Sequence, residues 1–411
     1  MKKTLFLAAV IALLPCLAGA SQDTQPLLLE EVIKEAREKN PEITAAKEKW
    51  QASVSRQGRV SGLPDPQAGF MWEQIPSGTF SFGEAMPMYS FSQMIPFPGK
   101  LVAEGRIAKA AAEMDRSAWE AKVREINART KTVYYDLYYA HRAIQINREN
   151  KELLKRFVNI AEVKYSVGKA AQYDILRARV ERDILENDLI ALELEKESVE
   201  AKLNALLNRP VDSRLGVPEE WELNSFDLEY GKLAEIALRN RPELKEASSA
   251  VEKSSHALGL AGSQYLPDFM LTYKNRLGMG WDAEVMFSFP LWFWKQSSGV
   301  KEAASEKLRA DASYQAMKNT VLAQVKAYIA KVQSGRRLVN LFKTSIVPQT
   351  TQTLEAAIIG YQNDKIDFLT LINTQRMFQD VKLKYWKAIV VYSQNLAELE
   401  QILGVDAGGL K

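Results

Sequence analysis

The sequence is poor in the residues that build reactive or metal-binding sites. Its 411 residues include one cysteine, Cys16, and two histidines, His141 and His256, which are far apart. Metal clusters of the Cys/His kind are therefore excluded, and if Cys16 leaves with an N-terminal leader the mature chain has no disulfide. No combination of a nucleophile, a base and an orienting acid is visible. We predict neither an enzyme nor a bound cofactor.

Long apolar runs are also scarce. One lies at the start, "MKKTLFLAAVIALLPCLAGA", where two lysines, an apolar stretch and small residues are typical of a secretory signal peptide (1–20) cleaved before Ser21. A lipoprotein signal using Cys16 is the alternative, although Pro15 stands where a small residue is usual, so lipidation of Cys16 stays open. After residue 20 no stretch has the ~18 apolar residues of a membrane helix, which excludes a bundle of such helices.

Excess charge is missing as well. The formal net charge is +3, and two of the positive charges, Lys2 and Lys3, belong to the predicted leader. A chain this close to balance lacks the basic surface that nucleic acids need. We therefore predict no nucleic-acid partner.

What the sequence does contain is an internal repeat. "NPEITAAKEKW" (40–50) recurs as "RPELKEASSAV" (241–251), and "YSVGKAAQYDIL" (165–176) recurs as "YQNDKIDFLTLI" (361–372). The order of the matching segments is kept. We predict two structural repeats, 21–208 and 232–411, joined by a connector, 209–231.

Each repeat contains long stretches without helix breakers. Neither glycine nor proline occurs from Arg106 to Val167, and at about 1.5 Å per residue a helix of this length spans roughly 90 Å. We predict long helical hairpins over 100–208 and 296–404. A helix from Val300 meets Pro348, where we expect a kink. From the helices alone, an ordinary antiparallel coiled coil is an equally good interpretation.

Short segments with alternating residues decide between an ordinary coiled coil and a protein that enters a membrane with strands. On one side they carry Phe, Tyr, Trp and aliphatic residues, and on the other they carry polar or charged residues. This pattern and length fit lipid-facing barrel strands, with Trp72, Trp281, Trp292 and Trp294 as an interfacial aromatic girdle. Because a barrel needs about eight strands, chains must share one, and the sequence alone leaves eight or twelve strands open. The segments are Pro66–Gln74, Met86–Ile95, Asp268–Arg276 and Trp281–Trp292.

The ordered features resemble the TolC family of outer-membrane efflux ducts over essentially the whole mature chain. The resemblance is carried by the doubled plan, "NPE" in the first half, "SQMIPFPGK" before the long helix and "YSVGKAAQYDILRA" at the helical turn. It implies a mainly α fold with membrane β: a homotrimer with a shared 12-stranded barrel in the outer membrane and a helical barrel in the periplasm. It also implies two partners, a periplasmic adaptor and an inner-membrane pump of the RND type.

Three shorter strings are similar to the branch of that family that serves heavy-metal (Czc/Cus-type) efflux: "PFPGK" (96–100), "LRA" (176–178) and "PLWFWKQ" (290–296). The resemblance places strand-to-helix bends at Pro96, Pro98, Gly99 and Pro290. It places adaptor contacts at the helical tips, Gly168, Lys169, Asp364 and Lys365, although any helical hairpin ends in glycine and charge.

The resemblance also implies a periplasmic entrance just past the second tip. Relatives can carry acidic residues where this chain has Thr370 and Asn373, so an acidic cation-binding ring is doubtful here. Asp367 and Asp174 lie nearby in the expected fold. A solvated helix start explains both carboxylates equally well.

We predict a passive outer-membrane exit duct for heavy-metal cations. Drugs or a secreted protein are alternative cargoes of the same fold, and a soluble periplasmic coiled-coil adaptor or tether is an alternative of another class. Methionines in or beside the strand segments suggest a path for soft metal ions, because thioethers bind such ions. The alternative is that they serve as apolar filling, the more common use of methionine. These methionines are Met71, Met86, Met88, Met94, Met270, Met279 and Met286.

Overall fold

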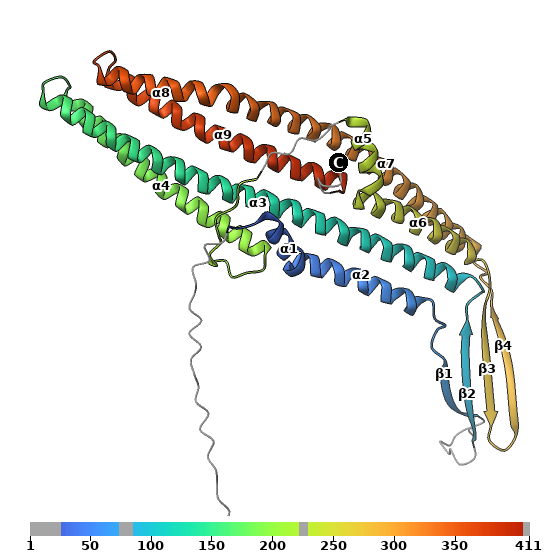
Figure 1. The fold of residues 1–411 in the computed structure, drawn as a ribbon. Helices are drawn as coiled ribbons and strands as arrows, with labels where there is room; N and C mark the ends of the chain where they lie inside the picture. The colour runs from blue at the N-terminus through green and yellow to red at the C-terminus, as the bar shows by residue number, and fades with distance from the viewer. Residues whose placement is uncertain (1–25, 74–84, 222–228, 406–411) are drawn as a thin grey trace, which may run out of the picture.

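The first half of the chain folds into helices, a pair of strands and a long helical hairpin. The computed structural model describes residues 26–73, 85–221 and 229–405 (Figure 1). The predicted leader with Cys16, the residue Gln74 and a section of the connector lie outside the described residues. In chain order, the first half contains α1 (Leu29–Lys39), α2 (Pro41–Val60), β1 (Gln67–Glu73), β2 (Met86–Ile95), α3 (Lys100–Ser166) and α4 (Gln172–Leu206).

The second half repeats this order, which confirms the predicted repeat. Its last long helix pair includes a short π-helical segment, η1, between α7 and α8. The elements are α5 (Tyr230–Asn240), α6 (Pro242–Ser263), β3 (Asp268–Arg276), β4 (Gly280–Ser288), α7 (Phe293–Leu341), η1 (Phe342–Ile346), α8 (Val347–Gln362) and α9 (Phe368–Leu403).

The long helices lie side by side in an elongated array, with the four strands at one end and the two hairpin turns at the other (Figure 1). With 67 residues, α3 alone spans about 100 Å. Large apolar side chains fill the seams between helices: Leu137 and Leu203 in the first half, Val325 and Leu399 in the second, and Phe157 and Leu371 where the two hairpins meet. These seams join the helices into a single continuous body.

At Pro348 the helix continues, as predicted, through a local change of winding. The five residues of η1 directly precede α8, in which Pro348 is the second residue. Proline has no N–H to donate and its ring crowds the preceding turn, so the helix widens locally there. The helix therefore changes its winding without ending.

The four strands form one antiparallel sheet in the order β1-β2-β3-β4. Continuous registers join them, with Phe70 opposite Tyr89, Phe91 opposite Tyr273, and Leu271 opposite Val285. Because β1 and β4 are the outer strands, each leaves one edge without a neighbouring strand among the described residues.

The predicted end of the fourth strand at Trp292 is wrong. β4 ends at Ser288, and Pro290 lies in the short connection that follows. Proline cannot donate a hydrogen bond to a strand ladder, so the pairing stops before it. The helix after it begins at Phe293, earlier than predicted, because the residues from Phe293 onward have no helix breaker until Gly299.

Among the residues that the structure describes, no helix is long and apolar enough to cross a membrane.

Candidate functional site

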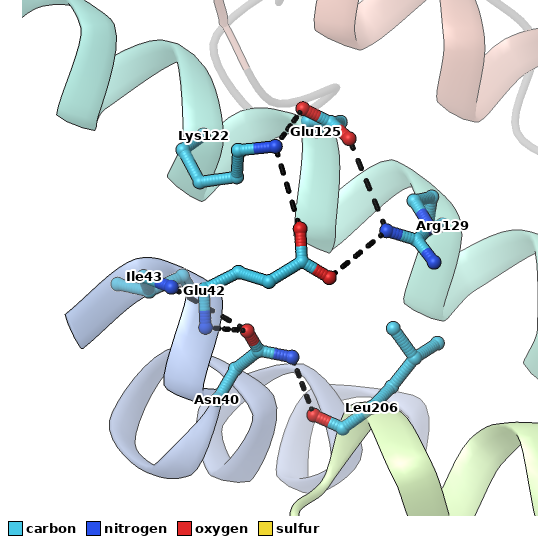
Figure 2. Close-up of polar contacts among 7 residues, drawn as sticks. All are labelled: Asn40, Glu42, Ile43, Lys122, Glu125, Arg129 and Leu206. Atoms are coloured by element: carbon cyan, nitrogen blue, oxygen red, sulfur yellow. Dashed lines mark hydrogen bonds and ion pairs between the residues drawn. The ribbon is translucent and has the colours of Figure 1, made fainter. Parts of the chain in front are cut away.

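The "NPE" segment forms a corner that fixes α2 against α3 and α4 (Figure 2). The Asn40 side chain accepts hydrogen bonds from the backbone N–H groups of Glu42 (2.9 Å) and Ile43 (3.4 Å), which caps α2. Its amide nitrogen donates to the carbonyl of Leu206 at the end of α4, at 2.9 Å. Pro41 at the first helical position needs no donor of its own. A single buried side chain therefore ties the start of α2 to the end of α4.

Glu42 extends this corner to α3. Its carboxylate oxygens lie 3.4 Å from the ammonium of Lys122 and 3.3 Å from the guanidinium of Arg129. Glu125 lies between these two cations and contacts both (Figure 2). In the second repeat Arg241 replaces the capping asparagine and provides no side-chain cap to α6. The two corners therefore share a shape and differ in their bonding.

The two hairpin turns have the same backbone design. Gly168 and Asp364 each occupy the left-handed region, with φ of 72° and 60°. In each turn the next residue, Lys169 or Lys365, donates its N–H back to the helix, at 2.8 Å. This closure is typical of helix C-termini. An aspartate tolerates the left-handed conformation less well than glycine does, and the carboxylate of Asp364 has partners that explain its presence.

Those partners come from the other hairpin. The Asp364 carboxylate accepts from the ammonium groups of Lys164 and Lys169, the latter at 3.0 Å. Lys164 also donates to the carbonyl of Tyr361 and lies 4.7 Å above its ring. The hydrogen bonds from the two lysines hold the pKa of Asp364 below its usual value. The two tips are thus joined through one carboxylate.

Below the tips the structure brings the two predicted acidic residues together. Asp367 caps α9 by accepting from the N–H of Thr370 at 2.9 Å, and this hydrogen bonding lowers the pKa of Asp367. Burial, and then repulsion from Asp367, raise the pKa of Asp174. Thr370 and Asn373 are exposed one turn apart on α9. All four residues predicted for the entrance therefore lie at the start of α4 or α9, next to the tips.

Several contacts between the hairpins were missed by the sequence analysis. Lys164 was one, and the ion pair of buried Glu181 with Arg376 was another. A third is the buried hydrogen bond from Gln375 to Asn150, at 3.0 Å. These partners are about 200 residues apart in sequence, and no local pattern separates them from the many polar residues on solvated helix faces.

The sheet has an unusual distribution of side chains. Aromatic residues of one face are widely exposed, for example Tyr89 and Phe91 at 51% each. On the other face Thr272 is buried and shares a 3.1 Å hydrogen bond with Ser92, and Lys274 pairs with Glu284 at 2.7 Å. A sheet of a water-soluble protein buries its apolar face. Here the apolar face is the open one, which confirms the predicted alternation and suits a lipid surface.

The four predicted girdle tryptophans lie at both ends of this sheet. Trp72 and Trp281 lie toward the ends far from the helices, whereas Trp292 and Trp294 lie at the start of α7, with ring centroids 5.0 Å apart. All four are exposed. Two separate groups are what amphipathic rings at the two boundaries of a membrane would form.

The bends between sheet and helices are fixed by a largely buried ion pair. Pro96, Pro98 and Gly99 connect β2 to α3, and Gly99 has a φ of 103° that favours glycine. The ammonium of Lys100, at the first turn of α3, lies 2.9 Å from the carboxylate of Asp268. Asp268 also accepts from the N–H of Phe97 at 2.7 Å. This contact joins the bend of the first repeat to the first strand residue of the second.

Within the described stretches of the chain, no group of three or more His, Cys, Asp or Glu side chains is arranged to hold a metal ion. The sequence pattern of the outer membrane efflux protein family matches residues 32–209 and 233–405. The chain belongs to this family. The two matched segments coincide with the two halves of the structure, so the two-fold repeat of the fold is also a repeat of the family's pattern.

Individual relatives span nearly the whole chain. The cobalt-zinc-cadmium resistance protein CzcC of Cupriavidus metallidurans is 20% identical over 391 residues, 92% of this chain and 90% of that protein. The CmeC outer membrane channel of Campylobacter jejuni has a TM-score of 0.80 at 18% identity, covering 93% of this chain and 86% of its own. The structure of CusC has a TM-score of 0.80 at 17% identity, with 92% of each chain covered.

Membership confirms the predicted family, the channel function and the location. The protein is an outer-membrane efflux channel of the TolC type, located in the outer membrane and extending into the periplasm. The family and these solved relatives are channels, so the prediction that the chain is not an enzyme is also confirmed.

Proposed function

We propose that three copies of this chain form an exit duct that conducts heavy-metal cations across the outer membrane. The observation that carries the proposal is the sheet: it turns an apolar face outward, and its outer strands have two edges unpaired among the described residues. In hydrocarbon, each unpaired backbone group costs several kcal/mol. Pairing β1 of one copy with β4 of the next satisfies both edges, and three four-stranded sheets close a barrel of twelve strands.

An exposed apolar row on α4 supports association of copies along the helices as well. Tyr173, Leu176, Val180 and Ile184 recur at helical spacing and are between 43% and 61% exposed. Such a row on a helix in water needs a partner. A neighbouring copy, placed by the edge pairing of the sheet, would cover it.

The proposed cargo is supported by two observations. The relative CzcC is named for resistance to cobalt, zinc and cadmium, and "PFPGK" and "PLWFWKQ" resemble the heavy-metal branch. We propose that a periplasmic adaptor binds the tips around Gly168, Lys169, Asp364 and Lys365, and that an inner-membrane RND pump supplies the energy. A duct for other cargo is the second candidate, because the match to CmeC, whose name specifies no metal, is equally extensive.

Growth of a deletion strain tests the cargo. We expect deletion of the gene to sensitise cells to copper, silver, zinc, cobalt or cadmium salts, and the intact gene to restore growth. Sensitivity only to lipophilic drugs would contradict the metal assignment and leave the duct. In parallel, purified protein in a planar bilayer should give discrete conductance steps, whose absence would contradict the duct.

The entrance has its own test. Thr370 and Asn373 are exposed one turn apart on α9, and we propose that they line the closed periplasmic entrance. Replacing both with aspartate, Thr370→Asp and Asn373→Asp, should make the conductance more sensitive to block by divalent cations. Unchanged block would remove both residues from the constriction.

A further inference from the structure

The methionines of the sheet all lie on one face. Successive residues of a strand point to opposite faces, and paired residues on neighbouring strands share a face. Met71 pairs with Met88, Met94 with Met270, and Met270 with Met286, through unbroken registers. Met86 is two residues from Met88 and so lies on the same face. All methionines of the described strands therefore lie on this face: Met71, Met86, Met88, Met94, Met270 and Met286.

This face is the polar one. Its other residues include Thr272, Lys274 and Glu284, whose hydrogen bond and ion pair join neighbouring strands. The opposite face carries Phe, Tyr, Trp, Leu and Val residues and no methionine among the described strands. If these methionines were apolar filling, the apolar face would be their place. Packing explains Met88, which is only 2% exposed, but it does not explain Met71, Met94 and Met286, which are 40% to 50% exposed on the polar face.

Three of them form a row across adjacent strands, next to the helical end of the sheet. Met94 of β2 faces Met270 of β3, which faces Met286 of β4. Directly opposed residues in antiparallel strands have Cβ atoms about 4.5–5.5 Å apart, within the range that lets flexible thioethers converge on one ion. Met94 and Met286 are 40% and 49% exposed, so the row is open to solvent on this face.

We propose that Met94, Met270 and Met286 form a thioether row that binds univalent soft cations, Cu(I) or Ag(I), on the inner face of the sheet. The placement of this face inside the duct rests on the function proposed above. Neutral thioether sulfur suits soft ions, whereas Zn(II) and Co(II) prefer imidazole, carboxylate or thiolate ligands, which the row lacks. Binding involves coordination only, without electron transfer.

A second pair of methionines lies further along the same face. Met71 and Met88 are opposed near the far end of the sheet, and Met88 is six residues from Met94. At about 3.4 Å per residue the two groups are roughly 20 Å apart along the strands. Met71 is 50% exposed and Met88 only 2% exposed, so an ion leaving the row meets the open Met71 thioether next toward the outside, as a conduction path with more than one weak site requires.

Silver binding by the purified full-length protein in detergent tests the row. In chloride-free nitrate buffer, titration with Ag(I) followed by calorimetry should show saturable binding. The triple variant Met94→Leu, Met270→Leu, Met286→Leu should bind at least about tenfold more weakly, since changes to groups that merely hold metal ligands already cost about 10- to 100-fold. Equal binding by wild type and variant would overturn the proposal, and so would equally tight binding of Zn(II) by the row.

Three methionines on helices provide the matched control. Met114→Leu, Met317→Leu and Met377→Leu change the same number of thioethers in α3, α7 and α9, and should leave Ag(I) binding unchanged. An equal loss in this control would show unspecific methionine binding and would overturn the proposal.

A measurement on the wild-type protein covers the case in which the triple variant fails to fold. Methionine oxidation by hydrogen peroxide, located by peptide mass spectrometry, should be slowed by Ag(I) at Met94 and Met286 and not at Met377. Absence of protection at the row would overturn the proposal. If the row does not bind Ag(I), the deletion strain can still become sensitive to metal salts. If the deletion strain does not become sensitive, Ag(I) binding at the row can still be measured, so the two proposals fail separately.

Discussion

The two ends of this molecule bury opposite kinds of side chain. Near the helical tips Phe157 and Leu371 are at most 1% exposed, and the charged side chains of Lys169 and Asp364 lie on the surface. In the sheet Tyr89 and Phe91 are half exposed, whereas Thr272 is buried. The same chain therefore follows the ordinary rule of a water-soluble protein at one end and reverses it at the other. The reversal indicates that the surroundings differ: water along the helices and lipid around the sheet.

The largest expected effect lies on the helical side of this comparison. Leu371 is fully buried between the two hairpins, and Leu371→Ala leaves a cavity there. We expect a loss of about 2–5 kcal/mol in the free energy of unfolding, measured by chemical denaturation followed by circular dichroism. Leu308→Ala, at a position on α7 that is 69% exposed, provides the comparison. A smaller loss for Leu371 than for Leu308 would contradict the assignment of the core.

The next effect lies in the sheet. Phe91→Lys places a charge in the middle of β2 on the apolar face, and we expect it to destabilise the lipid-embedded protein by about 2–4 kcal/mol. Ser92→Lys, one residue away on the polar face, should cost at most about 1 kcal/mol for the lost hydroxyl bond to Thr272. Unfolding by urea in lipid vesicles measures both. Equal costs would remove the distinction between the two faces.

A smaller loss of stability is expected at the corner of the first repeat, where Asn40 caps α2, whereas Arg241 provides no such cap in the second repeat. Asn40→Ala removes both the cap of α2 and the bond to the Leu206 carbonyl, at an expected cost of about 1–2 kcal/mol. Asn40→Ser should recover only the share that belongs to the cap, because serine can accept from α2 but cannot reach Leu206 as a donor. Thermal unfolding of the wild type, Asn40→Ala and Asn40→Ser gives the order of their stabilities. Full recovery by serine would show that the bond to α4 contributes nothing to stability.

The smallest effect concerns the tips. Because two lysines lower the pKa of Asp364, its ionised form is stabilised in the folded tip. That contribution is present above its usual pKa of 3.8 and is lost as the pH falls through the lower folded value. Hydrogen exchange of residues 360–366, corrected for intrinsic rates, should rise over that range. Asp364→Asn should remove this pH dependence, and an unchanged profile in that variant would contradict the role of the carboxylate.

Local patterns made much of this fold predictable. The alternation of Tyr89, Ser90 and Phe91 indicated a two-faced strand, and the absence of helix breakers after Arg106 indicated the length of α3. The end of β4 was misplaced because Trp292 extends an aromatic pattern past Pro290, although the proline ends the pairing. Contacts such as that of Lys164 with Asp364 depend on how two hairpins pack, and no pattern within one hairpin specifies the partner in the other.

The most direct test of the account asks which solvent meets each face of the sheet. Cys16 is the sequence's one cysteine and lies in the predicted leader, so Phe91→Cys and Ser92→Cys can each carry a single spin label. In lipid vesicles, the label at residue 91 should be relaxed mainly by oxygen, which concentrates in hydrocarbon. The label at residue 92 should be relaxed mainly by a water-soluble nickel complex. If the two adjacent labels show the same preference, the sheet does not separate lipid from water and the central claim is wrong.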